Sequence, residues 1–209
     1  MELIDIHTHN KEASTMHAIV CSPEYTSGRN ISLGIHPWDI DNQWKEHFAL
    51  IKEHAKERNV VAIGECGIDK LKSPASIEEQ TGVLRAHAEL AETSGKPLIL
   101  HCVKTIDEIL ALHHSMKPRQ AWIIHGFRGK PQQAAQLTAA GLQISLGEHF
   151  NKESAKSIPA DRIFVESDTS SMPIEEIYAA IAAARGCSIE ELARQVRDNA
   201  TRVFGAHIK

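Results

Sequence analysis

The chain has 209 residues, of which 42% are hydrophobic and 24% charged, and its formal net charge at pH 7 is −4. This size fits one domain or a small pair, because single cores rarely grow beyond about 250 to 300 residues. No apolar run approaches the roughly 20 residues of a membrane span, and the acidic balance excludes binding to nucleic acid through a globally basic surface. The first ten residues lack the basic start and long apolar stretch of a secretory signal. We therefore expect a single cytoplasmic domain over residues 1–209, with no membrane contact and no obligate protein partner.

Short apolar runs that recur along the whole chain predict the strands. They are nearly continuous in β-branched and aliphatic residues instead of alternating with polar ones, which is typical of strands buried on both faces of a parallel sheet. The eight runs are residues 3–6, 17–20, 31–35, 60–64, 97–100, 121–124, 142–146 and 162–165.

Amphipathic helical patterns lie between most of these runs. Ser188 and Glu191 form a capping-box pattern at the start of the last helix, and Gly186 is placed to end the helix before it. The expected helices are residues 42–58, 76–94, 105–115, 131–140, 174–185 and 188 to about 203.

The alternation of strands and helices predicts an α/β fold, and eight such units in so short a chain predict a minimal (β/α)8 barrel of the TIM type. One connection is irregular. Only residues 10–16 join the first two runs, whereas a parallel crossover needs a dozen residues or more. Either the first helix is missing, or the second run is not a regular parallel strand.

Ionisable residues stand at the ends of the apolar runs. In a barrel these carboxyl ends converge on the face where such enzymes build their active sites. His7 and His9 are two residues apart, so on a strand both point to the same side. The other candidates at run ends are His36, Glu65, His101, His125, Glu166 and Asp168.

A single histidine after a strand is more often a packed or capping residue. Six strands that all end in metal-type ligands point instead to a metal site. Four imidazoles and two carboxylates exceed the ligand set of a single tetrahedral ion and suit two ions that share a bridging carboxylate. Glu65 is the best candidate for the bridge, and Asp168 for a general base that also binds one ion. Such mixed ligands accept Zn, Mn, Fe, Co or, less readily, Mg.

Seven motifs occur in an order that resembles the TatD-like metal-dependent hydrolases. They are DIHTHN at 5–10, GIHP at 34–37, IGECGID at 63–69, LILH ending at residue 101, IIHGFRG at 123–129, VESD at 165–168 and DNATRVFG at 198–205. The resemblance implies a (β/α)8 barrel that hydrolyses DNA phosphodiesters with divalent metals. It places His7, His9, Glu65 and Asp168 on one metal and Glu65, His101 and His125 on the other, and it makes His36 a substrate-side residue.

The departures from the family pattern concern the substrate. Val103 stands where the family usually has arginine, Lys70 stands where it has an aromatic residue, and Gly126 and Arg128 replace two serines. We expect Lys104 and Arg128, with Lys70, to contact phosphate in compensation. The substrate is then a DNA end or a small phosphorylated molecule. The alternatives are hydrolysis of another small phosphoester, an amide or a lactone on the same barrel, or a metal-bound interaction module without catalysis.

Three further residues carry weaker expectations. Trp38 forms either a rim wall on which a base stacks or part of the core. Asp5 shares the side of His7, where it either orients that imidazole or has a solvated or capping role. His87 falls within a helical pattern and is expected at the surface.

Overall fold

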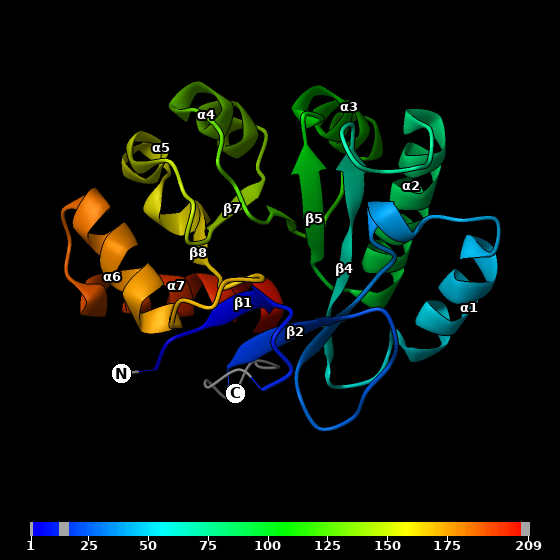
Figure 1. Cartoon of the computed structure of the whole chain (residues 1–209), viewed down its shortest axis with the longest axis horizontal. Coiled ribbons are helices and arrows are strands. Elements are labelled where there is room, and N and C mark those ends of the chain that lie inside the picture. Colours follow the sequence, from blue (N-terminus) through cyan, green and yellow to red (C-terminus); the bar gives the residue numbers. More distant parts are fainter. Residues whose placement is uncertain (1, 13–16, 206–209) are drawn as a thin grey trace. The chain divides into compact units, whose positions relative to one another are not determined.

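In the computed structural model, residues 2–12 and 17–205 are described, and all eight expected strands form (Figure 1). They are hydrogen-bonded in the order β1 to β8, and the pairs β1–β2, β3–β4, β4–β5 and β7–β8 are parallel. The strands are β1 (Asp5–Thr8), β2 (Ala18–Ser22), β3 (Ile31–Leu33), β4 (Val60–Asp69), β5 (Leu98–Val103), β6 (Trp122–Ile124), β7 (Gln143–Leu146) and β8 (Ile163–Val165).

The end of β8 returns to β1. Thr8 and Asp168 form a parallel bridge, the backbone N–H of Asp168 donates to the His7 carbonyl at 2.9 Å, and that of His9 donates to the Asp168 carbonyl at 3.0 Å. The last strand of the series therefore lies beside the first. Together with the strand order, this confirms the predicted (β/α)8 barrel.

The expected helices form within a few residues of their predicted bounds. Ser76 and Ser188 each complete a capping box, and Gly95 and Gly186 end helices in the left-handed conformation, which glycine adopts without a steric penalty. The helices are α1 (Trp44–His54), α2 (Ile77–Ser94), α3 (Ile106–Met116), α4 (Pro131–Ala139), α6 (Ile174–Arg185) and α7 (Ile189–Phe204).

Three short helices were not expected. They are α5 (Lys152–Ser157) and the 3-10 helices η1 (Pro37–Asp39) and η2 (Ala160–Arg162). Each is too short to show a hydrophobic period, and α5 starts through a local cap in which the Asn151 side chain accepts the Ser154 N–H at 3.0 Å.

The first two connections of the barrel are unusual. The first, residues 9–17, has no helix among its described residues, and its residues 13–16 lie outside the described part of the chain. β2 pairs with β1 as a parallel strand, with a shift of register between Asp5 and Thr8. Residues 23–30, between β2 and β3, are also without a helix, which the sequence did not indicate.

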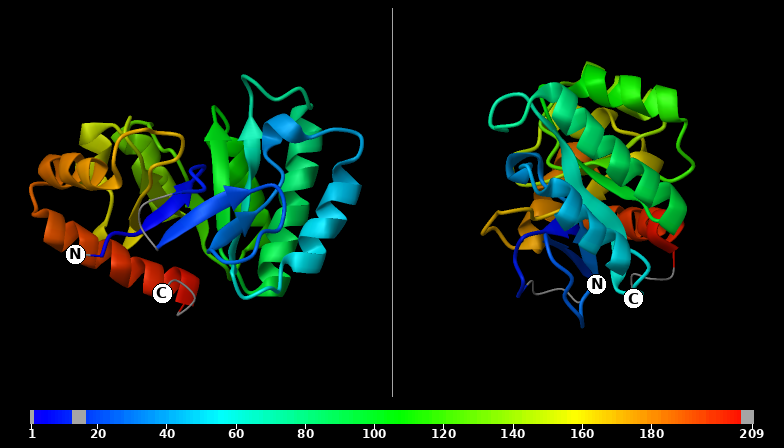
Figure 2. Two further views of the ribbon diagram at one scale, coloured as in Figure 1. Left: turned by 60° about the horizontal axis from the view of Figure 1, so that its bottom comes forward. Right: turned by 90° about the vertical axis from the view of Figure 1, so that its right-hand side faces the viewer.

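The chain divides into two compact units. The first contains the residues up to Val20 and those from Ile124 onward, and the second contains Cys21–Ile123. In the second unit α2 packs along β4 and β5 (Figure 2). In the first unit α7 packs on β8, with Phe164 and Tyr178 fully buried. None of the helices among the described residues is long and apolar enough to cross a membrane.

β4 is longer than predicted and continues through Asp69, so Glu65 lies within the strand and not at its end. Gly64 and Gly67 have positive φ angles of 128° and 150°. A Cβ atom at Gly67 would collide with the His101 carbonyl, and one at Gly64 with the Ile99 carbonyl. These glycines therefore let β5 approach β4 closely beside Glu65.

Candidate metal centre

In the first unit, β1 and the residues after β6 and β8 bring expected ligands together. The Nε2 atoms of His7 and His9 lie 3.9 and 3.7 Å from Asp168 Oδ1. The His125 ring centroid is 4.3 Å from that of His7, and ligand atoms of His7, His125 and Asp168 all lie within 4.8 Å of one another. His7 and His125 are buried, whereas His9 is exposed. We call these four residues the first donor cluster.

In the second unit, His36, Glu65 and His101 converge. Glu65 Oε1 lies 2.7 Å from His101 Nδ1 and 3.2 Å from His36 Nε2, and the two imidazole nitrogens are 3.3 Å apart. The Glu65 carboxylate is buried. We call these three residues the second donor cluster.

The two nitrogens of His101 face different carboxylates. Its Nε2 lies 3.1 Å from Asp69 Oδ2, and in the tautomer that binds a metal through Nδ1 this Nε2 carries the proton and donates it. The Nδ1 lone pair then faces Glu65 Oε1 at 2.7 Å. Two acceptor atoms at this distance repel unless a proton or a cation lies between them. A histidine that donates one N–H to a carboxylate and offers its other nitrogen is the usual arrangement of a metal ligand, so the donor set fits a divalent cation.

His36 has the opposite tautomer. Its Nδ1 accepts the backbone N–H of Trp38 at 3.1 Å, which leaves the proton on Nε2. This Nε2 lies 3.2 Å from Glu65 Oε1 and 3.3 Å from His101 Nδ1. His36 is therefore set as a hydrogen-bond donor at the cluster and not as a ligand, which suits the substrate-side role expected for it.

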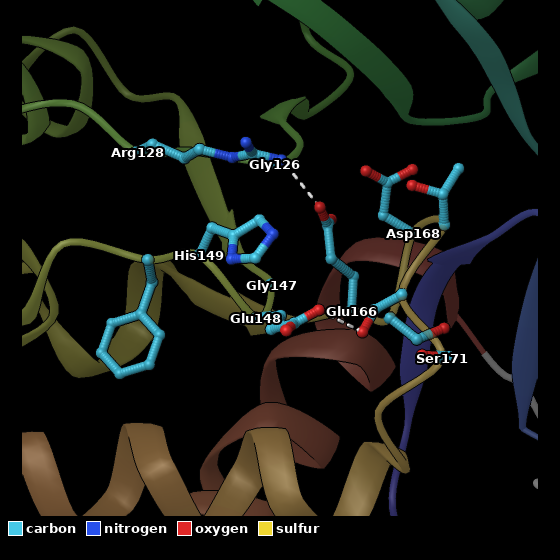
Figure 3. A pocket seen from close by; sticks show the side chains of 12 residues that line it. Gly126, Arg128, Gly147, Glu148, His149, Glu166, Asp168 and Ser171 are labelled. Atoms are coloured by element: carbon cyan, nitrogen blue, oxygen red, sulfur yellow. Dashed lines mark hydrogen bonds between the residues drawn. The ribbon is translucent and has the colours of Figure 1, made fainter.

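A buried carboxylate also contacts the histidine that follows β6. Glu166 Oε1 lies 3.3 Å from His125 Nδ1 and accepts the backbone N–H of Gly126 (Figure 3). Burial raises the pKa of Glu166, but His125, His7 and Ser145 outweigh burial and hold this pKa below its ordinary value. Glu166 is therefore ionised, and its Oε1 faces the Nδ1 side of the His125 ring.

Sequence reasoning did not assign these orienting roles to Asp69 and Glu166. Asp69 is buried and also accepts the Trp38 indole N–H at 2.7 Å. Its other oxygen accepts the backbone N–H groups of Leu71 at 2.7 Å and Lys72 at 3.0 Å. Burial raises the pKa of Asp69, yet the hydrogen bond from Trp38 and the others outweigh it and lower this pKa. The available signal was that both acids stand inside motifs that also hold expected ligands.

A pocket of about 320 Å³ opens beside the first donor cluster (Figure 3). Arg128, expected to contact phosphate, lines it together with Asp168. His149, exposed after β7, lines it as well, and Ser170 donates to Glu148 at 2.5 Å. The remaining lining residues are Gly126, Gly147, Phe150, Glu166, Ser167, Thr169 and Ser171.

The other expected rim residues differ from one another. Lys104 is exposed directly after β5. The Lys70 ammonium pairs with Glu108 at 2.5 Å, so part of its charge is already neutralised. Trp38 is 43% exposed, which rules out the core-packing alternative.

Two further residues are buried. Asp5 accepts the backbone N–H of His7 at 3.4 Å and the Ser167 hydroxyl at 2.6 Å, so it holds the backbone and not the imidazole. Burial raises the pKa of Asp5 to about 7.

The surface position expected for His87 is wrong. His87 is fully buried, its Nε2 accepts the Ile35 N–H at 3.0 Å, and burial lowers its pKa to about 4.

Comparison with known proteins extends these observations. A family model described as TatD related DNase matches residues 3–205. The chain is 29% identical over 198 residues to the "3'-5' ssDNA/RNA exonuclease TatD" of Erwinia billingiae, covering 82% of this chain and 76% of that protein. It is 28% identical over 196 residues to the "Uncharacterized metal-dependent hydrolase YabD" of Bacillus subtilis, covering 83% and 76%. The crystal structure of YjjV, a TatD homologue from Escherichia coli, superposes with a TM-score of 0.85 at 20% identity over 98% of both chains.

Proposed function

Because this chain belongs to the TatD-related DNase family of metal-dependent hydrolases, we propose that it is a phosphodiesterase that shortens single-stranded DNA or RNA from an end with two divalent cations. The relative from Erwinia billingiae carries the name of a single-stranded DNA/RNA exonuclease. The proposal keeps the substrate class that the motifs predict and extends it to RNA.

One observation supports the metal chemistry most strongly. In each unit, a histidine of the donor cluster meets a buried carboxylate through one ring nitrogen: His101 meets Asp69 at 3.1 Å and His125 meets Glu166 at 3.3 Å. Metal-ligating histidines usually donate their other ring N–H to a group such as a carboxylate. Two histidine–carboxylate pairs of this kind therefore support a metal site. We propose that His101 with Glu65 holds one cation. His7, His9, His125 and Asp168 offer ligands for the other.

The family resemblance predicts a different assignment for His125, on the ion of His101, and a bridging role for Glu65. The fit of each donor cluster to a cation does not depend on them. When bound, divalent cations lower the pKa of water toward neutrality and offset the charge that develops on phosphoryl oxygens. The remaining contributions come from side chains of the chain.

Four side chains have proposed roles toward substrate. Asp168 Oδ1 accepts the proton of the attacking water, since it is partly exposed at the mouth of the pocket. His36 donates its Nε2 proton in a hydrogen bond to a phosphoryl oxygen, because Trp38 fixes the tautomer that carries this proton. Arg128 binds a phosphate in the pocket that it shares with Asp168. Lys104, exposed after β5, adds positive charge for the polynucleotide backbone.

The test pairs metal content with hydrolysis. Purified protein is analysed for bound metal, then assayed with Mn²⁺ or Mg²⁺ on labelled single-stranded DNA and RNA and on a generic phosphodiester. We expect about two equivalents of metal and shortening of both strands that chelator abolishes. His101→Ala should lose metal and activity, and Asp168→Asn should lose activity with only part of its metal. His47→Ala, which removes an exposed histidine on α1, is the matched control.

Two results would contradict the proposal. Protein that takes up no metal and cleaves none of the substrates would leave an interaction role without metal or catalysis as the better description. Metal-loaded protein that cleaves the generic diester but neither polynucleotide would keep the metal site and assign the enzyme to smaller phosphorylated substrates.

A further inference from the structure

We propose that Trp38 and Lys72 form a platform that binds the terminal nucleobase and neighbouring phosphate of a single-stranded substrate. This inference rests on the proposed function and names the part of the substrate that the second unit recognises. It assigns Trp38 a role in specificity, because a phosphoester without a base would gain nothing from the platform.

The indole of Trp38 is exposed and yet held in place. Its side chain is 43% accessible, while its Nε1–H donates to Asp69 Oδ2 at 2.7 Å and its backbone N–H donates to His36 Nδ1 at 3.1 Å. Exposed aromatic side chains usually lose rotamer freedom when a ligand orders them. This indole is ordered beforehand by a buried carboxylate, so stacking a base on it costs little entropy.

The platform lies next to the second donor cluster. The Trp38 ring centroid is 4.6 Å from that of His36 and 5.8 Å from that of His101. A base stacked on the indole therefore leaves its own phosphate within reach of the donor residues. The same carboxylate, Asp69, holds both the indole and the imidazole of His101, which fixes the distance between the two.

Lys72 supplies a movable cation over the ring. Its ammonium lies 4.5 Å from the Trp38 ring centroid, a cation–π geometry, whereas its backbone N–H is fixed on Asp69 at 3.0 Å. The exposed lysine stem can swing away while the loop stays in place. We infer that an arriving base stacks on the ring in place of the ammonium. The ammonium then moves to the phosphate and pairs with its negative charge.

The loop around the indole is rigid and partly apolar. Ser73 donates its hydroxyl to the Pro37 carbonyl at 2.6 Å, which ties the loop after β4 to η1. Leu71, held through its backbone by Asp69, leaves 68% of its side chain exposed. Bases have apolar faces and single strands leave them unstacked, so this combination of fixed aromatic surface and cation is typical of single-stranded nucleic acid binding.

The experiment compares two oligonucleotides whose terminal residues differ only in the presence of the base. Oligothymidylate with an ordinary terminal nucleotide and the same strand with an abasic terminal sugar are cleaved under identical metal conditions. Stacking of one base on an aromatic side chain changes affinity by about five- to a hundredfold, so kcat/KM should favour the base-bearing end by at least about fivefold. Trp38→Ala should bring this ratio close to one, and Trp38→Phe should retain most of it.

Leu50→Ala, a truncation of another exposed apolar side chain, is the matched control and should keep the full ratio. Lys72→Gln should raise KM for both ends alike and reduce the dependence of KM on salt. If the kcat/KM ratio of Trp38→Phe falls as far as that of Trp38→Ala, the hydrogen bond from the indole to Asp69, and not stacking, is responsible for the preference. That result would refute the platform.

A second readout separates the inference from the proposed function. The binding of fluorescently labelled oligothymidylate is measured by anisotropy in the presence of chelator, where no hydrolysis occurs. We expect Trp38→Ala to weaken binding at least fivefold and Leu50→Ala to leave it unchanged. Unchanged binding and an unchanged cleavage ratio in Trp38→Ala would overturn the platform while the hydrolase stands. If Trp38→Ala loses binding but the unaltered protein cleaves no phosphodiester, the platform stands and the proposed activity is overturned.

Discussion

Replacement of Asp69 by asparagine tests whether a buried carboxylate fixes the proposed ligand His101. The carboxylate accepts four hydrogen bonds, two on each oxygen. Oδ2 receives Trp38 Nε1–H at 2.7 Å and His101 Nε2–H at 3.1 Å, and Oδ1 receives the backbone N–H groups of Leu71 at 2.7 Å and Lys72 at 3.0 Å. Asparagine has one acceptor oxygen, so its NH₂ group must face two donors on one side.

The expected loss follows from this count. A hydrogen bond to a charged group contributes about 1.5 to 3 kcal/mol, and rearrangement of the exposed loop recovers part of it. We expect Asp69→Asn to lower the free energy of unfolding by about 3 kcal/mol. Without the carboxylate, the His101 proton is no longer held on Nε2, and metal affinity should fall about 10- to 100-fold.

Stability is measured by urea denaturation of the metal-free protein, and affinity by calorimetric titration with Zn²⁺ or Mn²⁺. Asp39→Asn, on the exposed residue that ends η1, removes the same charge and serves as the control. Wild-type metal affinity in Asp69→Asn would refute the reasoning, even if stability fell. Equal losses in Asp39→Asn would show that net charge and not the hydrogen-bond geometry is responsible.

Three other predictions concern stability and substrate. Burial lowers the pKa of His87 from 6.5 to about 4. The stability that the neutral imidazole supports is therefore present above pH 6.5 and is lost as pH falls to about 4, by about 3 kcal/mol in total. The urea midpoints of His87→Gln should show a flatter pH profile over this range. Gly67→Ala should destabilise the protein by about 3 kcal/mol or more because its Cβ meets the His101 carbonyl, whereas Gly82→Ala, an open helical position, should stabilise it by up to about 1 kcal/mol in the same thermal melts. Arg128→Gln should raise KM for single-stranded DNA about tenfold with little change in kcat, and an unchanged KM would remove Arg128 from the phosphate site.

The strands and most helices could be predicted because their signals are local. A run such as residues 60–64 is nearly all β-branched or aliphatic, and Ser76 with Glu79 specifies a helix start by itself. The short helix α5 could not be predicted, since six residues held by the Asn151 cap carry no period. His87 was misplaced for a related reason. Its helix has a moderate pattern, and only the hydrogen bond with Ile35, distant in sequence, shows that the imidazole is buried.

The candidate ligands were predictable from residue type at strand ends, whereas the groups that orient them depend on contacts between strands. Parallel pairing sets Gly67 of β4 opposite His101 of β5. Side chains at alternate positions of a strand point to the same side, so Glu65 and Asp69 flank Gly67 on the face toward His101. The missing side chain leaves room for the His101 backbone carbonyl, and the imidazole meets Glu65 through Nδ1 and Asp69 through Nε2. The spacing Glu-x-Gly-x-Asp thus combines a proposed ligand, a glycine that admits the neighbouring backbone and an orienting acid. This interpretation of the spacing requires the register with β5, because the backbone that approaches Gly67 belongs to the neighbouring strand.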